Sequence, residues 1–161
     1  MLIGIDPGVN GAVGILRDDG IFMEVHDIPN RPVPGSGRIR REIDVFMLDQ
    51  IMEDIRQRHD GKKWRLCIEK SFGGKSMFAQ AVMSLGESLG IIRGIVEPLF
   101  GTEAVFYVAP ARWKKAYRLG RDKNASLDLA RTRFPEAPLN LKKHHNRCEA
   151  LLLALFLRDF H

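Results

Sequence analysis

The chain has only two cysteines among its 161 residues, and they stand far apart, at positions 67 and 148. Neither forms a C-x-x-C pair, which argues against a zinc site. Both lie among apolar residues, as in "RLCIE" and "RCEALLL". Such thiols are typical of buried, unpaired cysteines in a reducing compartment.

Long hydrophobic runs are also missing. The longest one, within 150–157, is far too short for a membrane span, which needs about 20 apolar residues. The opening "MLIGIDPG" places Gly, Asp and Pro where a signal peptide needs an apolar stretch. Internal repeats and low-complexity segments are absent too. We therefore expect a soluble intracellular protein.

What the chain does have is apolar content and positive charge. Hydrophobic residues make up 45% of it, enough for a folded core, and its length favours a single domain over 1–161. Lysine and arginine outnumber the acids by 25 to 20, a net charge of +5. This excess suggests an anionic partner, most often nucleic acid, although it also serves solubility.

Hydrophobic periodicity predicts an α/β fold. Short apolar runs predict strands, and apolar residues at helical spacing predict helices. The segment 29–41, with three prolines and four arginines, is expected to be a basic loop. The order of elements predicts a mixed five-stranded sheet flanked by helices. The expected strands are 2–5, 11–16, 21–28, 63–72 and 104–110, and the expected helices are 42–58, 76–99, 123–133 and 146–158.

Three carboxylates stand where apolar elements begin or end. Asp6 follows the first strand, Glu69 lies near the end of a later strand, and Glu149 opens the apolar helix 146–158. A buried carboxylate is costly unless it is paired or binds a metal. Convergent carboxylates suit Mg²⁺ or Mn²⁺, and two such ions per site can serve phosphoryl displacement.

Each of these acids also has an ordinary structural interpretation. Asp6 in "DPG" could start a turn, and Glu69 could be an ion-paired strand residue. Asn146 and Glu149 have the spacing of a helix capping box, with Asn146 as N-cap. The glycine-rich "GIDPGVNGAVG" could cradle phosphate as in sugar-kinase-like ATPases, but those need two domains, and no Walker A lysine follows.

Four segments together resemble the RuvC family of Holliday-junction resolvases, near its phage and organelle branch. They are "IGIDPGVNGAVGI", "CIEKSF", "PARWKK" and "NRCEALLLAL", in the family's order along nearly the whole chain. The resemblance implies an RNase H-like fold and a homodimer that cuts four-way DNA junctions symmetrically with divalent metal. It also implies a cytoplasmic or nucleoid location, the cytoplasm of a phage-infected host, or an organelle matrix.

Carried over by position, the resemblance makes Asp6, Glu69 and Glu149 catalytic metal ligands. The family's fourth acid falls on Asn146, so His144 or His145 is the preferred candidate for that place, His144 as a catalytic group and His145 as a metal ligand. Helix 76–99 would carry much of the dimer interface. Phe72 would stack on bases at the crossover. The expected phosphate contacts are Lys75, Lys114, Lys115, Arg118, Arg121 and Lys123.

Two other functions remain open at this point. The chain could be a nuclease of the same fold that acts on RNA–DNA hybrids or flaps. It could also be a junction-binding protein that does not cut, or an inactivated variant, because Asn146 replaces an acid.

Overall fold

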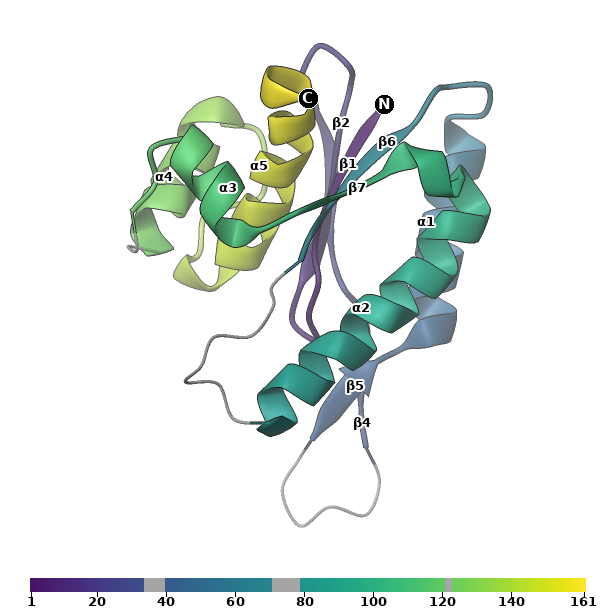
Figure 1. The fold of residues 1–161 in the computed structure, drawn as a ribbon. Coiled ribbons are helices and arrows are strands. Elements are labelled where there is room, and N and C mark those ends of the chain that lie inside the picture. Colours follow the sequence, from purple (N-terminus) through teal and green to yellow (C-terminus); the bar gives the residue numbers. More distant parts are fainter. Residues whose placement is uncertain (34–39, 71–78, 121–122) are drawn as a thin grey trace.

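A five-stranded sheet in the order β3-β2-β1-β6-β7 forms the centre of the molecule (Figure 1). The computed structural model describes residues 1–33, 40–70, 79–120 and 123–161. The first three strands are antiparallel, and β6 and β7 run parallel to β1, which confirms the predicted mixed sheet. The strands are β1 (Leu2–Asp6), β2 (Ala12–Leu16), β3 (Phe22–Asp27), β6 (Arg65–Glu69) and β7 (Val105–Val108).

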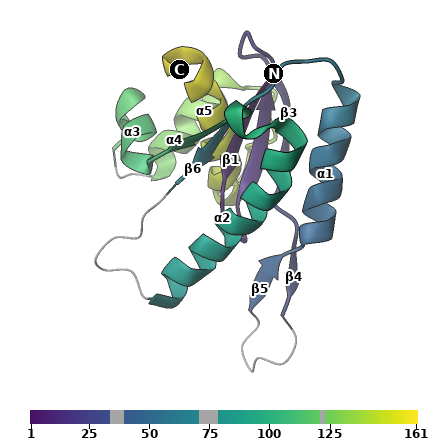
Figure 2. The same ribbon diagram turned by 45° about the vertical axis from the view of Figure 1, so that its right-hand side comes forward.

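Helices cover both faces of this sheet (Figures 1 and 2). On one face lie α1 (Val45–Arg58) and α2 (Ala79–Phe100). On the other lie α3 (Pro110–Ala116), α4 (Lys123–Arg133) and α5 (His145–Phe160). Two short 3₁₀ helices, η1 (Thr102–Ala104) and η2 (Lys142–His144), precede β7 and α5. Within the described residues, no helix has the length and apolar character to span a bilayer.

Alternation along the strands separates two cores. In β1, Ile3 and Ile5 pack with α1 and α2, whereas Leu2 packs with α3 to α5. Because side chains alternate in a strand, Asp6 points to the same face as Leu2. Cys67 belongs to that second core as well, so Glu69, two residues later, shares its face.

Two glycines let α5 lie directly on the sheet. Gly4 and Gly14 are cross-strand partners in β1 and β2. A Cβ at Gly4 would lie 2.0 Å from the backbone oxygen of Ala150, and one at Gly14 would lie 2.8 Å from the backbone nitrogen of Leu151. The helix can approach the strands this closely only because these two positions have no side chains. This contact fixes the distance between α5 and the sheet.

The cysteines behave as predicted. Cys67 and Cys148 are buried and unpaired. Burial raises the pKa of each thiol to about 12, so both are protonated at neutral pH. They act as small apolar residues of the core beneath the candidate site.

The structure corrects two parts of the predicted pattern. Strand β4 (Asn30–Pro32) lies within the expected loop 29–41, and β5 (Arg41–Ile43) runs from its last residue into the start of the expected helix 42–58. The two strands pair as a ribbon that projects from the body (Figure 2). Three-residue strands are too short to show an alternating pattern. Helix α3 was not predicted, because Pro110 was taken as the end of a strand. Proline at the first helical position is instead compatible with a helix start.

Candidate active site

Asp6 and Glu69 lie side by side at the carboxyl ends of parallel strands. The register pairs Ile5 of β1 with Ile68 of β6, so the next residues of the two strands are neighbours. Both side chains point to the face covered by α5. Glu149 lies just after the first turn of that helix and is 9% exposed. Carboxyl ends of parallel strands are the usual position of a binding site in an α/β sheet.

The three acids influence one another electrostatically. Burial, together with the nearby charges of Glu69 and Glu149, raises the pKa of Asp6 to about 8, and Lys114 acts in the opposite direction. Burial also raises the pKa of Glu69, against the hydrogen bond from Trp113. No group in the described part of the chain donates a hydrogen bond to the Asp6 carboxylate. The site therefore holds more negative charge than its surroundings compensate.

Helix α3 brings a donor to each glutamate. It starts directly after β7, at the same edge of the sheet (Figure 1). The indole Nε1 of the fully buried Trp113 donates to Glu69 Oε2 over 2.7 Å. The ammonium of Lys114 donates to Glu149 Oε1 over 2.8 Å and lies 5.1 Å from the centre of the Trp113 ring.

Trp113 is a site residue that the sequence analysis missed. The sequence signal that could have found it is its place within "PARWKK". A buried tryptophan there needs an acceptor for its indole N–H, and a site carboxylate can be that acceptor. Lys114 was expected to contact phosphate. The structure places its ammonium on a carboxylate of the site, where it is 30% exposed on its side chain.

The three candidates for the fourth position separate into two pockets. Asn146 lines the same pocket as Asp6, and its amide nitrogen donates to the carbonyl oxygen of Asn10. His144 and His145 line a neighbouring pocket instead. Nδ1 of His144 accepts the backbone N–H of Leu141, and partial burial lowers its pKa, with a further contribution from Arg147. The catalytic role of any of the three stays a prediction.

The capping-box interpretation of Asn146 and Glu149 is wrong. Helix α5 begins at His145, so its N-cap is His144, and no side chain caps it. Asn146 is already inside the first turn, where its side chain reaches away to Asn10. Glu149 therefore does not cap the helix, and its carboxylate accepts a hydrogen bond from Lys114.

The donor set suits a hard divalent cation, since it offers carboxylate oxygens from three elements. As the described residues stand, no three His, Cys, Asp or Glu side chains are close enough together to hold one ion. Two of the acids are engaged elsewhere, Glu69 with Trp113 and Glu149 with Lys114. In each glutamate one oxygen accepts this hydrogen bond, and the Lys114 ammonium also adds a positive charge that competes with a cation for Glu149.

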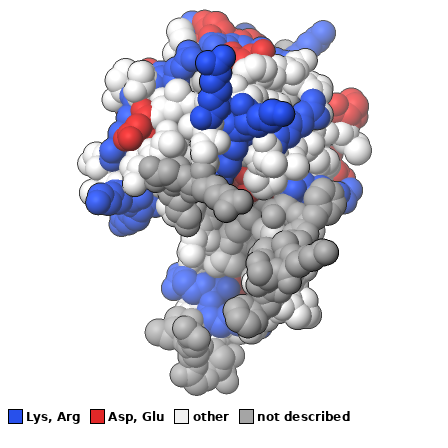
Figure 3. All heavy atoms as spheres, turned by 60° about the vertical axis from the view of Figure 1, so that its left-hand side comes forward, with Lys and Arg blue, Asp and Glu red and all other residues white. Residues whose placement is uncertain are grey.

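Basic side chains surround this edge of the molecule. Lys115 lies in the last turn of α3 with its side chain exposed, and Arg118 follows the helix, also exposed. Figure 3 shows lysine and arginine gathered on the upper body of this face and again on the lower projection that carries the ribbon. Lys123 begins α4. Phe72, Lys75 and Arg121 lie outside the described residues.

Comparison with known proteins finds similarity among solved structures. No family model matches the chain, and no curated protein matches it either. Among solved structures, it is similar to T. thermophilus RuvC in complex with a Holliday junction substrate. The TM-score is 0.59 at 14% identity, over 97% of this chain and 93% of that one.

The chain has an RNase H-like fold. At this identity the likeness shows the fold alone. It agrees with the fold implied by the sequence resemblance to RuvC, and membership of that family, with its branch, stays a prediction.

Proposed function

We propose that the protein is a metal-dependent endonuclease that resolves four-way DNA junctions by paired symmetric nicks. The observation that carries this proposal is the convergence of Asp6, Glu69 and Glu149 at one edge of the sheet, with the pKa of Asp6 raised to about 8. The fold supports it, because the similar T. thermophilus RuvC structure contains a Holliday junction substrate.

In this proposal Asp6, Glu69 and Glu149 hold Mg²⁺ or Mn²⁺, two ions per site. Such ions, when bound, supply activation of a water molecule and stabilisation of the leaving oxygen. Trp113 fixes the orientation of Glu69 through its 2.7 Å hydrogen bond. Lys114, once it releases Glu149, can contact a phosphate oxygen, and Lys115 and Arg118 neutralise phosphates nearby.

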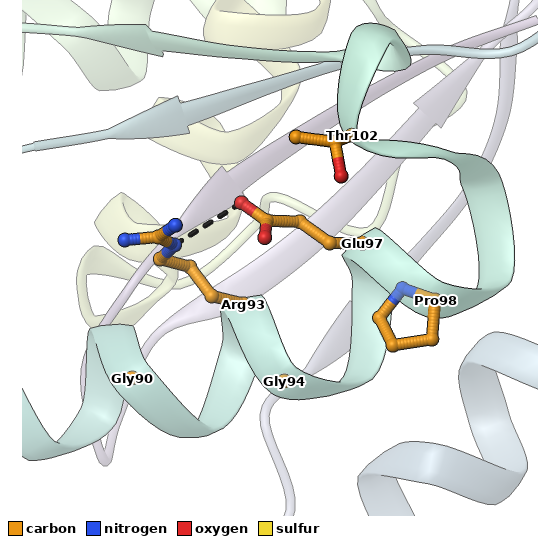
Figure 4. A pocket seen from close by; sticks show the side chains of 6 residues that line it. All are labelled: Gly90, Arg93, Gly94, Glu97, Pro98 and Thr102. Atoms are coloured by element: carbon orange, nitrogen blue, oxygen red, sulfur yellow. Dashed lines mark hydrogen bonds and ion pairs between the residues drawn. The ribbon is translucent and has the colours of Figure 1, made fainter.

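A homodimer would present two such sites to one junction, which suits two symmetric nicks. The exposed face of α2 supports this part of the proposal. Positions 86, 90 and 94 are glycines four residues apart, and a Cβ at any of them would meet nothing within 4 Å. Gly90 and Gly94 border an open pocket beside the Arg93–Glu97 ion pair (Figure 4). Met83, one turn before Gly86, is 75% exposed.

The test is a cleavage assay with labelled four-way junction, linear duplex and RNA–DNA hybrid, each with Mg²⁺ or Mn²⁺. Symmetric nicks in the junction alone are expected. Glu69→Gln should abolish cleavage and keep junction binding, because it removes a ligand charge and leaves the basic surface unchanged. Equal cutting of linear duplex, or preference for the hybrid, would replace this function by another nuclease activity.

A second candidate function is junction binding without cleavage. It is favoured by Asn146, an amide that lines the pocket of Asp6 where the RuvC resemblance expects an acid. An amide is a weaker metal ligand than a carboxylate and cannot act as a base. If the protein binds junctions without cutting, Asn146→Asp should introduce cleavage, whereas an active protein should not require this change.

A further inference from the structure

A second pocket opens beside the candidate active site and is lined by basic side chains. Lys143, His144, His145 and Arg147 line it from η2 and the first turn of α5. Asn10, Asp27, Ile28 and Asn30 complete its wall from the other side. We infer that this pocket binds a backbone phosphate of the DNA strand that is cut, one or two nucleotides from the scissile phosphate. This inference rests on the proposed function and assigns a strand-binding subsite to it.

Asp27, the one acid among the described residues that line the pocket, is neutralised within the protein. Both oxygens of Asp27 accept hydrogen bonds from the Arg147 guanidinium, from Nε and from one terminal nitrogen, at 2.6 Å each. Arg147 and Asp27 thus compensate each other and shape the wall. The Lys143 ammonium is therefore the positive charge of the pocket that no acid of its lining compensates, and the imidazoles of His144 and His145 add polar groups beside it for an anionic ligand.

Two of these side chains have hydrogen-bonding groups that no described residue engages. Lys143 is exposed, and neither Lys143 nor His145 has a hydrogen bond or ion pair with any described residue. His144 is less available, because its Nδ1 accepts the backbone N–H of Leu141. Lys143 and His145 are therefore the residues expected to hold the phosphate.

The pocket adjoins the pocket of Asp6. Asn10 and Asn146 line both pockets, and the side chain of Asn146 donates a hydrogen bond to the backbone oxygen of Asn10. His145 and Glu149 are four residues apart on one face of α5, which is about 6 Å along the helix axis. One DNA strand advances about 3.4 Å per nucleotide along its axis, so this separation corresponds to about two nucleotides.

This assignment gives the two histidines a role that fits their position. One or the other was expected to fill the fourth position of the metal site, yet both line the neighbouring pocket rather than that of Asp6. A chain that contacts its substrate strand here can place the scissile phosphate over the carboxylates without using either histidine as a metal ligand.

The experiment measures binding of a labelled four-way junction in EDTA by fluorescence anisotropy, over a series of salt concentrations. The test variant is the double substitution Lys143→Ser with His145→Gln. The control is Lys62→Ser, an exposed lysine that precedes β6, at the opposite end of the strand from Glu69. We expect the double variant to bind at least about fivefold more weakly and its salt slope to fall by about 1. The control should match the wild type.

A second measurement locates the contact. Single neutral methylphosphonate linkages are placed at successive positions on both sides of the cut. The wild type should lose affinity at a linkage within two nucleotides of the cut, and the double variant should lose nothing further there. Lys143→Ser alone, a change at an exposed side chain, should show part of the same effect if the double variant proves unstable.

The outcomes separate the two proposals. If the wild type binds and cuts junctions but the double variant behaves like the control, the phosphate pocket is wrong and the proposed function stands. The phosphate pocket is also wrong if the wild type and the double variant lose the same affinity at every neutral linkage. A wild type that does not bind junctions overturns both.

Discussion

Replacing Asp6 by asparagine should stabilise the metal-free protein at alkaline pH. The pKa of this carboxyl rises from its ordinary value of 3.8 to about 8, because burial disfavours the charged form and Glu69 and Glu149 repel it. Between these pH values the folded protein binds a proton that the unfolded chain releases. The stability that proton binding by Asp6 gives to the folded protein is fully present below about pH 4 and is lost as the pH rises to about 8.

The interval between the two pKa values sets the size of the effect. Each pH unit within it removes up to ~1.4 kcal/mol of stability, so about four units set an upper limit of ~5–6 kcal/mol. Asp6 retains some exposure and has Lys114 nearby, which reduces the cost. We expect Asp6→Asn to be more stable than the wild type by ~2–4 kcal/mol at pH 9, and by much less at pH 5.

Urea unfolding in EDTA at pH 5 and pH 9 measures this difference. Asp49→Asn, at an exposed position of α1 on the other face of the sheet, is the matched control and should leave the pH dependence unchanged. Added Mn²⁺ should then stabilise the wild type at pH 9 but not Asp6→Asn. A wild type whose stability does not fall between pH 5 and pH 9, relative to Asp6→Asn, would refute the reasoning.

Three further substitutions probe the packing around the acids. Trp113→Phe removes the N–H donor of Glu69 and should weaken Mn²⁺ binding about tenfold to a hundredfold by calorimetry, whereas Trp64→Phe on the other face should not. Lys114→Gln removes an ammonium that competes with a metal ion for the Glu149 carboxylate, so Mn²⁺ should bind at least about threefold more tightly. Unchanged Mn²⁺ affinity would mean that Lys114 does not compete. Gly4→Ala should cost at least ~3 kcal/mol in urea unfolding, because its Cβ would overlap the backbone of α5.

The sequence predicts the strands of the sheet and the three acids, because these depend on local patterns. An apolar strand that ends in an acid, such as the one that ends in Asp6, can be recognised from the sequence without knowing where the strand lies in the fold. The contact between Trp113 and Glu69 depends on how a seven-residue helix follows β7, and no periodicity reveals that. The positions of His144 and His145 depend on the path of the chain through η2, which places them beside Asp27 rather than Asp6.

The close packing of α5 on β1 also has a consequence for synthesis of the protein. The strand that carries Asp6 is among the first segments to leave the ribosome, yet its cover and Glu149 come about 145 residues later. Until α5 emerges, one face of the sheet exposes its apolar residues and the acidic site is incomplete. A nascent chain should thus depend on chaperones for that face, and if the proposed function holds, it cannot bind metal at a finished site or cut nearby DNA before its last helix docks.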